Sequence, residues 1–221
     1  MKSNTKLTYG IIGLGRFGTA LASSLAEAGC DILVLDRNEE KVRAMRTYTD
    51  AAYVTSSLSK DTLTEAGIAN CDVVVVCIGS QLDVSILTTL TVVSLGVKRV
   101  IAKATTKEQG EVLEKLGAEV IYPEHDMAIR LAKKLTSASL IEYLSLSNEI
   151  EISEIKITDK LVGKTLADAN LRSRFSINVI ALEHGETTEI TLSPDYSFAD
   201  GDIVVVIGQG NDIKRFEAFL N

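Results

Sequence analysis

Gly10-Ile11-Ile12-Gly13-Leu14-Gly15-Arg16-Phe17-Gly18 joins a short apolar strand to a glycine-rich turn and then to an amphipathic helix, predicted from Phe17 to Ala28. Gly13 permits the tight turn, Gly15 lets the backbone approach a phosphate, and Gly18 lets helix and strand pack closely. The free amide groups at the start of the helix can then bind an anion. This stretch therefore predicts a pyrophosphate site on the first turn of a Rossmann domain.

An acidic residue supports this interpretation. Asp36 follows the second apolar strand, Ile32 to Leu35. Its carboxylate can accept hydrogen bonds from both ribose hydroxyls and would repel a 2′-phosphate. Adenosine nucleotides or NAD(H) are therefore favoured over NADP(H). The alternative is a degenerate Rossmann domain that binds nothing, but strand, turn, helix and acid all agree with a binding site.

Strands and helices alternate up to about residue 144. The strands are continuous apolar runs, which is typical of a parallel sheet covered by helices on both faces. We therefore predict an α/β fold with a doubly wound parallel Rossmann sheet. The predicted strands are 9–12, 32–35, 51–54, 73–76, 99–103 and 119–121, and the helices 17–28, 39–48, 60–66, 82–95 and 107–116. A long helix from Asp126 to Leu144 should leave this sheet.

A second, smaller domain follows the first. From Ser147 the apolar runs give way to segments that mix apolar and charged residues, as half-exposed strands do. We predict a Rossmann domain over residues 1–144 and a small α+β domain over residues 145–221. The second domain should contain strands at 150–157, 178–182, 190–192 and 203–207 and helices at 166–171 and 212–220.

Composition narrows the classes of function. The formal net charge is −7, and no dense Lys/Arg cluster offers a face for a nucleic acid polymer. Cys30, Cys71 and Cys77 form no C-x-x-C motif and are expected to be buried thiols in a reducing compartment. The longest apolar run, residues 73–78, is too short to span a bilayer, and the polar start lacks a signal peptide. These features predict a cytoplasmic protein.

The sequence does not favour an enzyme. A dehydrogenase needs an acid or base beside the nicotinamide, and the only histidines are His125 and His184, both in predicted loops. Neither a nucleophile motif nor a cluster of metal ligands accompanies them. A small NAD(H)-binding oxidoreductase or a redox-sensing regulator nevertheless remains an alternative.

Arg16 lies inside the glycine-rich turn. A cation at a helix N-terminus opposes the helix dipole, which favours an anion nearby. We therefore expect Arg16 to bind a phosphate in its own site or in that of a neighbouring subunit. The alternative is a solvated charge on the first helical turn.

Five segments together resemble the RCK family, also called KTN or TrkA-type. This family comprises the cytoplasmic gating subunits of Ktr and Trk potassium uptake systems, and the resemblance extends over essentially the whole chain. It is strongest to the peripheral regulatory subunits of Ktr systems. The segments are Gly10 to Gly18, Leu35-Asp36-Arg37-Asn38, Tyr122 to Ala128, Leu161 to Leu166 and Ala199-Asp200-Gly201-Asp202.

The resemblance implies a non-enzymatic regulator of potassium transport that ATP activates and ADP inactivates. It implies homodimers that assemble into an octameric ring beneath an integral-membrane potassium transporter subunit, at the inner face of the cell membrane. Arg16 would contact the γ-phosphate bound in the adjacent subunit, while Lys103 would lie on the phosphate side of the site. Glu124 would help bind a divalent cation, Mg²⁺ or Ca²⁺, at paired ATP sites.

The full set of residues implied at the nucleotide site comes from the glycine-rich turn and the ends of the following strands. It comprises Gly13, Gly15, Arg16, Phe17, Gly18, Asp36, Arg37, Asn38, Ser57, Leu58, Gly79, Ser80, Gln81, Lys103 and Glu124. Among these, Asp36 and Asn38 would hold the ribose, and Ser57 and Leu58 would line the adenine.

The resemblance also implies a second ligand. In several Ktr subunits the C-terminal domain binds cyclic di-AMP at its dimer interface, and this inactivates transport. The matching residues are Leu171, Arg172, Asn178, Val179 and Pro194. The alternative is a dimerisation domain without a ligand.

Overall fold

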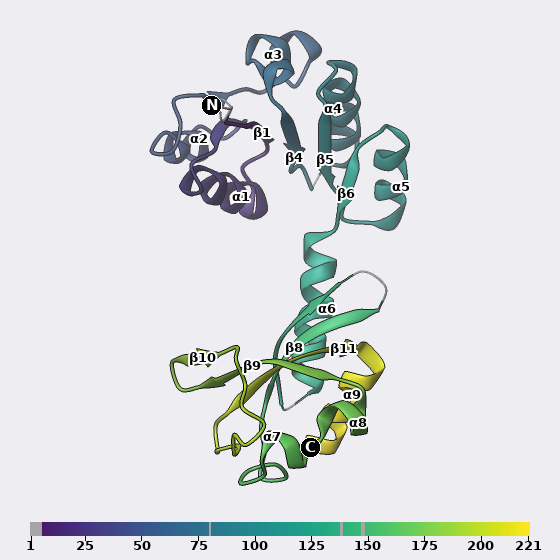
Figure 1. Ribbon diagram of the computed structural model, residues 1–221. Coiled ribbons are helices and arrows are strands. Elements are labelled where there is room, and N and C mark those ends of the chain that lie inside the picture. The colour runs from purple at the N-terminus through teal and green to yellow at the C-terminus, as the bar shows by residue number, and fades with distance from the viewer. Residues whose placement is uncertain (1–5, 80, 138, 147–148) are drawn as a thin grey trace, which may run out of the picture. The chain divides into compact units, whose positions relative to one another are not determined.

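The computed structural model describes residues 6–79, 81–137, 139–146 and 149–221 (Figure 1). The chain forms two compact units, of which the first ends at Asp126 and the second spans Met127–Asn221.

The first unit contains a six-stranded, all-parallel sheet with the strand order β3-β2-β1-β4-β5-β6. This order, with its reversal between β1 and β4, is that of a doubly wound Rossmann domain, so the predicted fold is confirmed. The strands are β1 (Thr8–Ile12), β2 (Asp31–Asp36), β3 (Ala52–Val54), β4 (Val73–Val76), β5 (Arg99–Lys103) and β6 (Glu119–Ile121).

Helices follow the strands and cover both faces of the sheet. Neighbouring residues of one strand enter different cores: Ile11 packs with Val34 and Val75, whereas Ile12 packs with Leu35 and Val76. This double burial explains the continuous apolar runs. The helices are α1 (Arg16–Glu27), α2 (Glu39–Met45), α3 (Lys60–Glu65), the 3-10 helix η1 (Ile68–Asn70), α4 (Leu82–Ser94) and α5 (Lys107–Lys115).

The second unit is built on a five-stranded antiparallel sheet with the order β10-β9-β11-β8-β7. Its strands are β7 (Leu140–Ser145), β8 (Ile150–Lys156), β9 (Asn178–His184), β10 (Thr187–Glu189) and β11 (Ile203–Gln209). Its core includes Ile155, Val204 and Phe216. The remaining helices are α6 (Pro123–Thr136), which begins in the first unit, and α7 (Leu166–Ala169), α8 (Leu171–Phe175) and α9 (Gly210–Leu220).

Two predicted elements are wrong. The long helix ends at Thr136, and Leu140–Ser145 instead forms β7 paired with β8. The predicted strand 190–192 is irregular, because the hairpin pairs Thr187–Glu189 with β9 and leaves Ile190 79% exposed. In both places pairing with the neighbouring strand of a hairpin overrides the pattern within the segment itself. Residues 127–144 thus belong to the second unit, so the division differs from the predicted boundary at residue 144.

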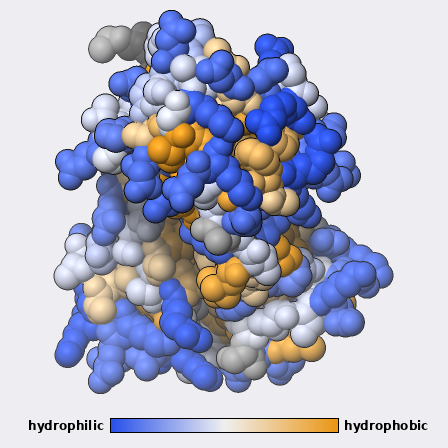
Figure 2. Space-filling view, turned by 90° about the horizontal axis from the view of Figure 1, so that it is seen from below, coloured by the Kyte–Doolittle hydropathy of each residue, from blue (hydrophilic) through white to orange (hydrophobic). Residues whose placement is uncertain are grey.

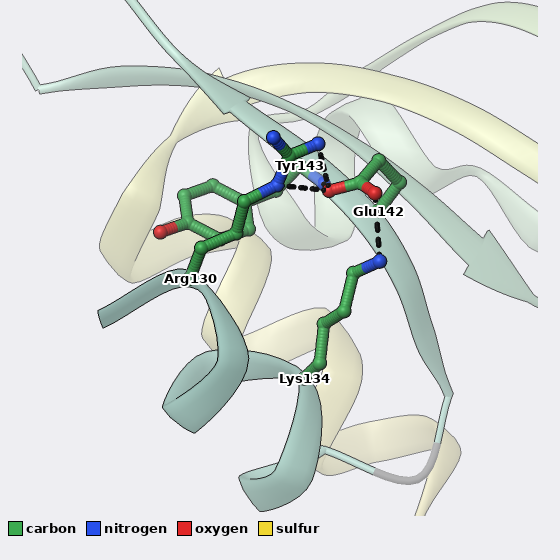
Figure 3. A network of polar contacts seen from close by, with 4 residues as sticks. All are labelled: Arg130, Lys134, Glu142 and Tyr143. Atoms are coloured by element: carbon green, nitrogen blue, oxygen red, sulfur yellow. Dashed lines mark hydrogen bonds and ion pairs between the residues drawn. The ribbon is translucent and has the colours of Figure 1, made fainter. Parts of the chain in front are cut away.

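Glu142 on β7 is the centre of a polar network that holds α6 (Figure 3). Arg130 Nε donates to its Oε1 over 2.8 Å, and Lys134 Nζ donates to its Oε2 over 2.7 Å. The two cations are four residues apart and so lie on one face of the helix. These hydrogen bonds, with a third from the Tyr143 amide, lower the pKa of Glu142 to about 2.

This network predicts a specific dependence of stability on pH. Because the folded pKa of Glu142 lies below its unfolded value of about 4.3, its contribution is present above that value and disappears as the pH falls towards the folded pKa, about 2. In Glu142→Gln, the urea midpoint should therefore fall less steeply between about pH 5 and pH 2 than in the wild type. Parallel pH profiles for the two proteins would contradict this role.

The surface of α6 is unusual because none of its residues is buried. Met127, Leu131 and Leu135, spaced by four residues, are 58%, 54% and 77% exposed. On the face drawn in Figure 2, apolar residues (orange) likewise interrupt a mainly hydrophilic surface. Across the described residues, every helix is too short or too polar to traverse a bilayer.

Candidate nucleotide-binding site

A cavity of about 640 Å³ opens at the carboxyl ends of the parallel strands. This volume lies within the range of ligand pockets, and the position is where α/β sheets bind ligands. Its lining comprises Ile12, Gly13, Gly15, Arg16, Phe17, Leu35, Asp36, Arg37, Lys41, Thr55, Ser56, Leu58, Cys77, Ile78, Gly79, Gln81, Val84, Lys103, Thr105 and Glu124.

The glycine-rich turn gives this cavity its floor. Gly13 has a φ of +99°, a conformation that favours glycine. A Cβ on Gly18 would lie 2.0 Å from the Gly13 carbonyl oxygen, so α1 and the turn pack too closely for a side chain. A Cβ on Gly15 would instead meet no atom within 4 Å, which leaves room for a ligand.

The N-terminus of α1 faces this open space. Its cap residue, Gly15, has no side chain to accept from the first amides, and the first turn contains no acid. The first amide groups of a helix have no carbonyl partner within the helix. They are therefore available to a phosphate.

Asp36, at the end of β2, holds the turn in place. Its Oδ2 accepts from the buried Leu14 amide over 2.5 Å, and its Oδ1 accepts from the Asn38 amide over 2.8 Å. A carboxylate has about four lone-pair sites, so both oxygens can still accept from ribose hydroxyls. Asp36 thus fixes the turn and lines the cavity at once.

Three charged residues meet at another part of the lining. Lys103, at the end of β5, is only 9% exposed, and its ammonium forms an ion pair with Glu124 on α6. The hydrogen bond from Lys103 is the main cause that lowers the pKa of Glu124, and the charge of Arg16 lowers it further. Two cations and one carboxylate therefore share this end of the cavity.

A hydrogen bond and a buried thiol also belong to the lining. Arg37 Nη1 donates to Gln81 Oε1 over 3.5 Å. This hydrogen bond links the residue that follows β2 to the connection between β4 and α4. Cys77 follows β4 and is buried, and this burial raises the pKa of its thiol to about 12. The side chain is therefore a neutral thiol near neutral pH.

The cavity gathers most of the predicted site residues, but it leaves out several. Gly18 packs beneath the turn, the Asn38 side chain caps α2, and Ser57 lies outside the lining. Ser80 falls outside the described residues. The prediction missed nine residues of the lining, which are Ile12, Leu35, Lys41, Thr55, Ser56, Cys77, Ile78, Val84 and Thr105. The rule that ligands bind where parallel strands end could have found Thr55, Cys77 and Thr105.

Comparison with known proteins decides the family. The TrkA-N domain family matches residues 9–123, and the TrkA-C domain family matches residues 150–221. The chain belongs to the TrkA-N/TrkA-C (RCK) family.

RCK proteins of potassium transport are similar along nearly the whole chain. Ktr system potassium uptake protein C of Bacillus subtilis is 36% identical over 213 residues, which are 96% of each chain. Ktr system potassium uptake protein A of the same organism is 35% identical over 95% of each chain. These relatives confirm the predicted kinship with proteins of Ktr potassium uptake systems.

The RCK fold also has a solved counterpart, the GsuK channel bound to NAD. It superposes with a TM-score of 0.53 at 22% identity, covering 100% of this chain and 39% of the channel. At this identity the similarity establishes the fold alone.

The candidate cyclic di-AMP residues of the TrkA-C domain differ in their exposure to solvent. Arg172, Asn178 and Pro194 are exposed, and Val179 is half-buried. Leu171 is only 3% exposed and belongs to the core, so it holds α8 in place and is not available for contact. The Ala167 amide donates to the Pro194 carbonyl over 2.9 Å, which ties the Pro194 loop to α7.

Proposed function

We propose that this RCK protein is the nucleotide-binding gating subunit of a Ktr-type potassium uptake system, with ATP as activator and ADP as inactivator. The observation that supports this most directly is the distribution of charge around one cavity. A carboxylate, Asp36, is placed for a ribose, while Arg16, Lys103 and the start of α1 are placed for phosphates.

This arrangement can distinguish ATP from ADP. The γ-phosphate adds charge and oxygen acceptors that guanidinium groups bind strongly. A ligand shifts a conformational equilibrium only through contacts that differ between the two states. Contacts made by the γ-phosphate and lost in ADP would supply that difference.

A small NAD(H)-binding oxidoreductase or redox-sensing regulator is the second candidate, because Asp36 equally suits the ribose of NAD(H). Titrating ATP, ADP and NADH while following thermal stability and oligomer size separates the two. A ligand that binds only the folded protein raises its stability by mass action. Stabilisation by ATP and ADP supports the gating subunit, whereas stabilisation by NADH with hydride turnover would overturn it.

Arg16→Ala tests the γ-phosphate contact. The variant should lose the preference for ATP over ADP, by about tenfold in affinity ratio, and should still bind ADP. Calorimetric titration of both nucleotides measures this ratio. An equal loss for ATP and ADP would argue against a γ-phosphate contact.

The proposal includes an assembly. The exposed stripe of Met127, Leu131 and Leu135 on α6 is suited to bury against a second copy of this chain. Homodimers would then form an octameric ring, docked through protein contacts on an integral-membrane potassium transporter subunit at the cytoplasmic side. Light scattering with and without ATP measures the size of the assembly.

Two further ligands belong to the proposal. The described residues contain no cluster of three potential metal-ligating side chains, and Glu124 is paired with Lys103. A Mg²⁺ or Ca²⁺ ion at Glu124 would therefore need phosphate oxygens as further ligands. Cyclic di-AMP would bind the TrkA-C domain through the exposed Arg172, Asn178 and Pro194, and the same thermal titration tests it.

A further inference from the structure

Lys103 is a nearly buried cation whose charge needs a partner. Its side chain is 11% exposed, whereas that of Glu124, its partner, is 66% exposed. A buried ammonium without a counter-ion is strongly unfavourable. Glu124 supplies that counter-ion from the edge of the cavity.

We propose that Glu124 acts as an internal anion that occupies Lys103 until a nucleotide phosphate takes its place. This inference rests on the proposed function and adds to it a competition for one ammonium group. Both residues line the same cavity, and the ammonium also lies close to Gly79 on the lining. A phosphate that enters there meets Lys103 already neutralised by the protein.

Glu124 can leave Lys103 at low cost. It lies in the first turn of α6, where the helix dipole favours a negative charge. Because two-thirds of its side chain is exposed, water can solvate it after release. Lys103 is too enclosed to follow it into solvent. The phosphate therefore replaces the carboxylate at a lysine that stays in place.

Calorimetric titration of ADP and ATP into the full-length protein tests this competition, in EDTA and at fixed ionic strength. Glu124→Gln removes the competitor and should bind both nucleotides about three- to fivefold more tightly than the wild type. Glu119→Gln is the matched control. It makes the same change in charge at the opposite end of β6, where Glu119 pairs with exposed Arg99. Its affinities should stay within about twofold of the wild type.

Lys103→Gln separates competition from simple repulsion between Glu124 and phosphate. In this background, Glu124→Gln should give a smaller gain, because no ammonium remains to be released. An unchanged gain would overturn the inference, as would equal, weaker or undetectable binding by Glu124→Gln in EDTA. If the wild type binds neither nucleotide even with Mg²⁺, the proposed function fails instead.

Discussion

Gly18→Ala should destabilise the Rossmann unit by about 3 kcal/mol or more and abolish nucleotide binding. The added Cβ would lie 2.0 Å from the Gly13 carbonyl oxygen, which is backbone and has no rotamer to change. Either α1 must move away from β1, or the turn must open. Hydrogen exchange read separately over residues 6–126 and 127–221 should show the loss of protection confined to the first unit.

Gly15→Ala is the matched control three residues earlier. Its backbone has φ −71° and ψ −176°, which alanine adopts freely, and a Cβ there meets no atom within 4 Å. This variant should fold like the wild type but bind ATP and ADP more weakly, because its methyl group enters the cavity. If Gly15→Ala lost as much stability as Gly18→Ala, the close contact between residue 18 and the Gly13 carbonyl would not be the cause of the loss.

Asp202→Ala should have the second largest effect, in the TrkA-C unit. Asp202 is fully buried and accepts from the Tyr196 hydroxyl over 2.9 Å and from the Ala199 amide over 2.8 Å. Its other oxygen lies 2.6 Å from His184 Nδ1. Truncation leaves the hydroxyl and the amide without their acceptor, which should cost about 2–5 kcal/mol. Hydrogen exchange of β9 and β11 measures this loss.

A spectroscopic measurement checks the same contacts. Burial, followed by the hydrogen bond to Asp202, raises the pKa of Tyr196 to about 12. In Asp202→Ala, ultraviolet titration should give a Tyr196 pKa closer to the ordinary value of about 10. His184→Ala is the control, because its side chain is 63% exposed and its loss leaves the acceptors of Tyr196 and Ala199 intact. Equal destabilisation by both variants would assign the effect to His184.

The Rossmann unit could be predicted from the sequence because its signals are local. Most strands are apolar runs, and three of the helices begin at a recognisable cap, Asn38, Ser59 or Thr106, whose side chain accepts from the first turn. Strand β4 and strand β5 have the predicted bounds, Val73–Val76 and Arg99–Lys103. Local pattern and global fold agree in this unit, so the pattern was sufficient.

The second unit was harder to predict because the position of a strand in it depends on the strand that pairs with it. Leu140–Ser145 has the apolar spacing of a helix, yet it pairs with β8, and Glu142 binds the preceding helix through Arg130 and Lys134. Register decides which residues of an antiparallel strand are buried, and register is set by the neighbouring strand. No local pattern contains that information.

For the candidate site, the sequence by itself determined the glycine-rich turn, Arg16 and Asp36, because turn conformation and helix start are properties of adjacent residues. Only the tertiary structure decided that Asp36 binds the Leu14 amide, that Cys77 lines the cavity and that Lys103 pairs with Glu124. These contacts join residues from different strand ends. Parallel strands bring those ends together at one edge of the sheet, whatever the length of chain between them.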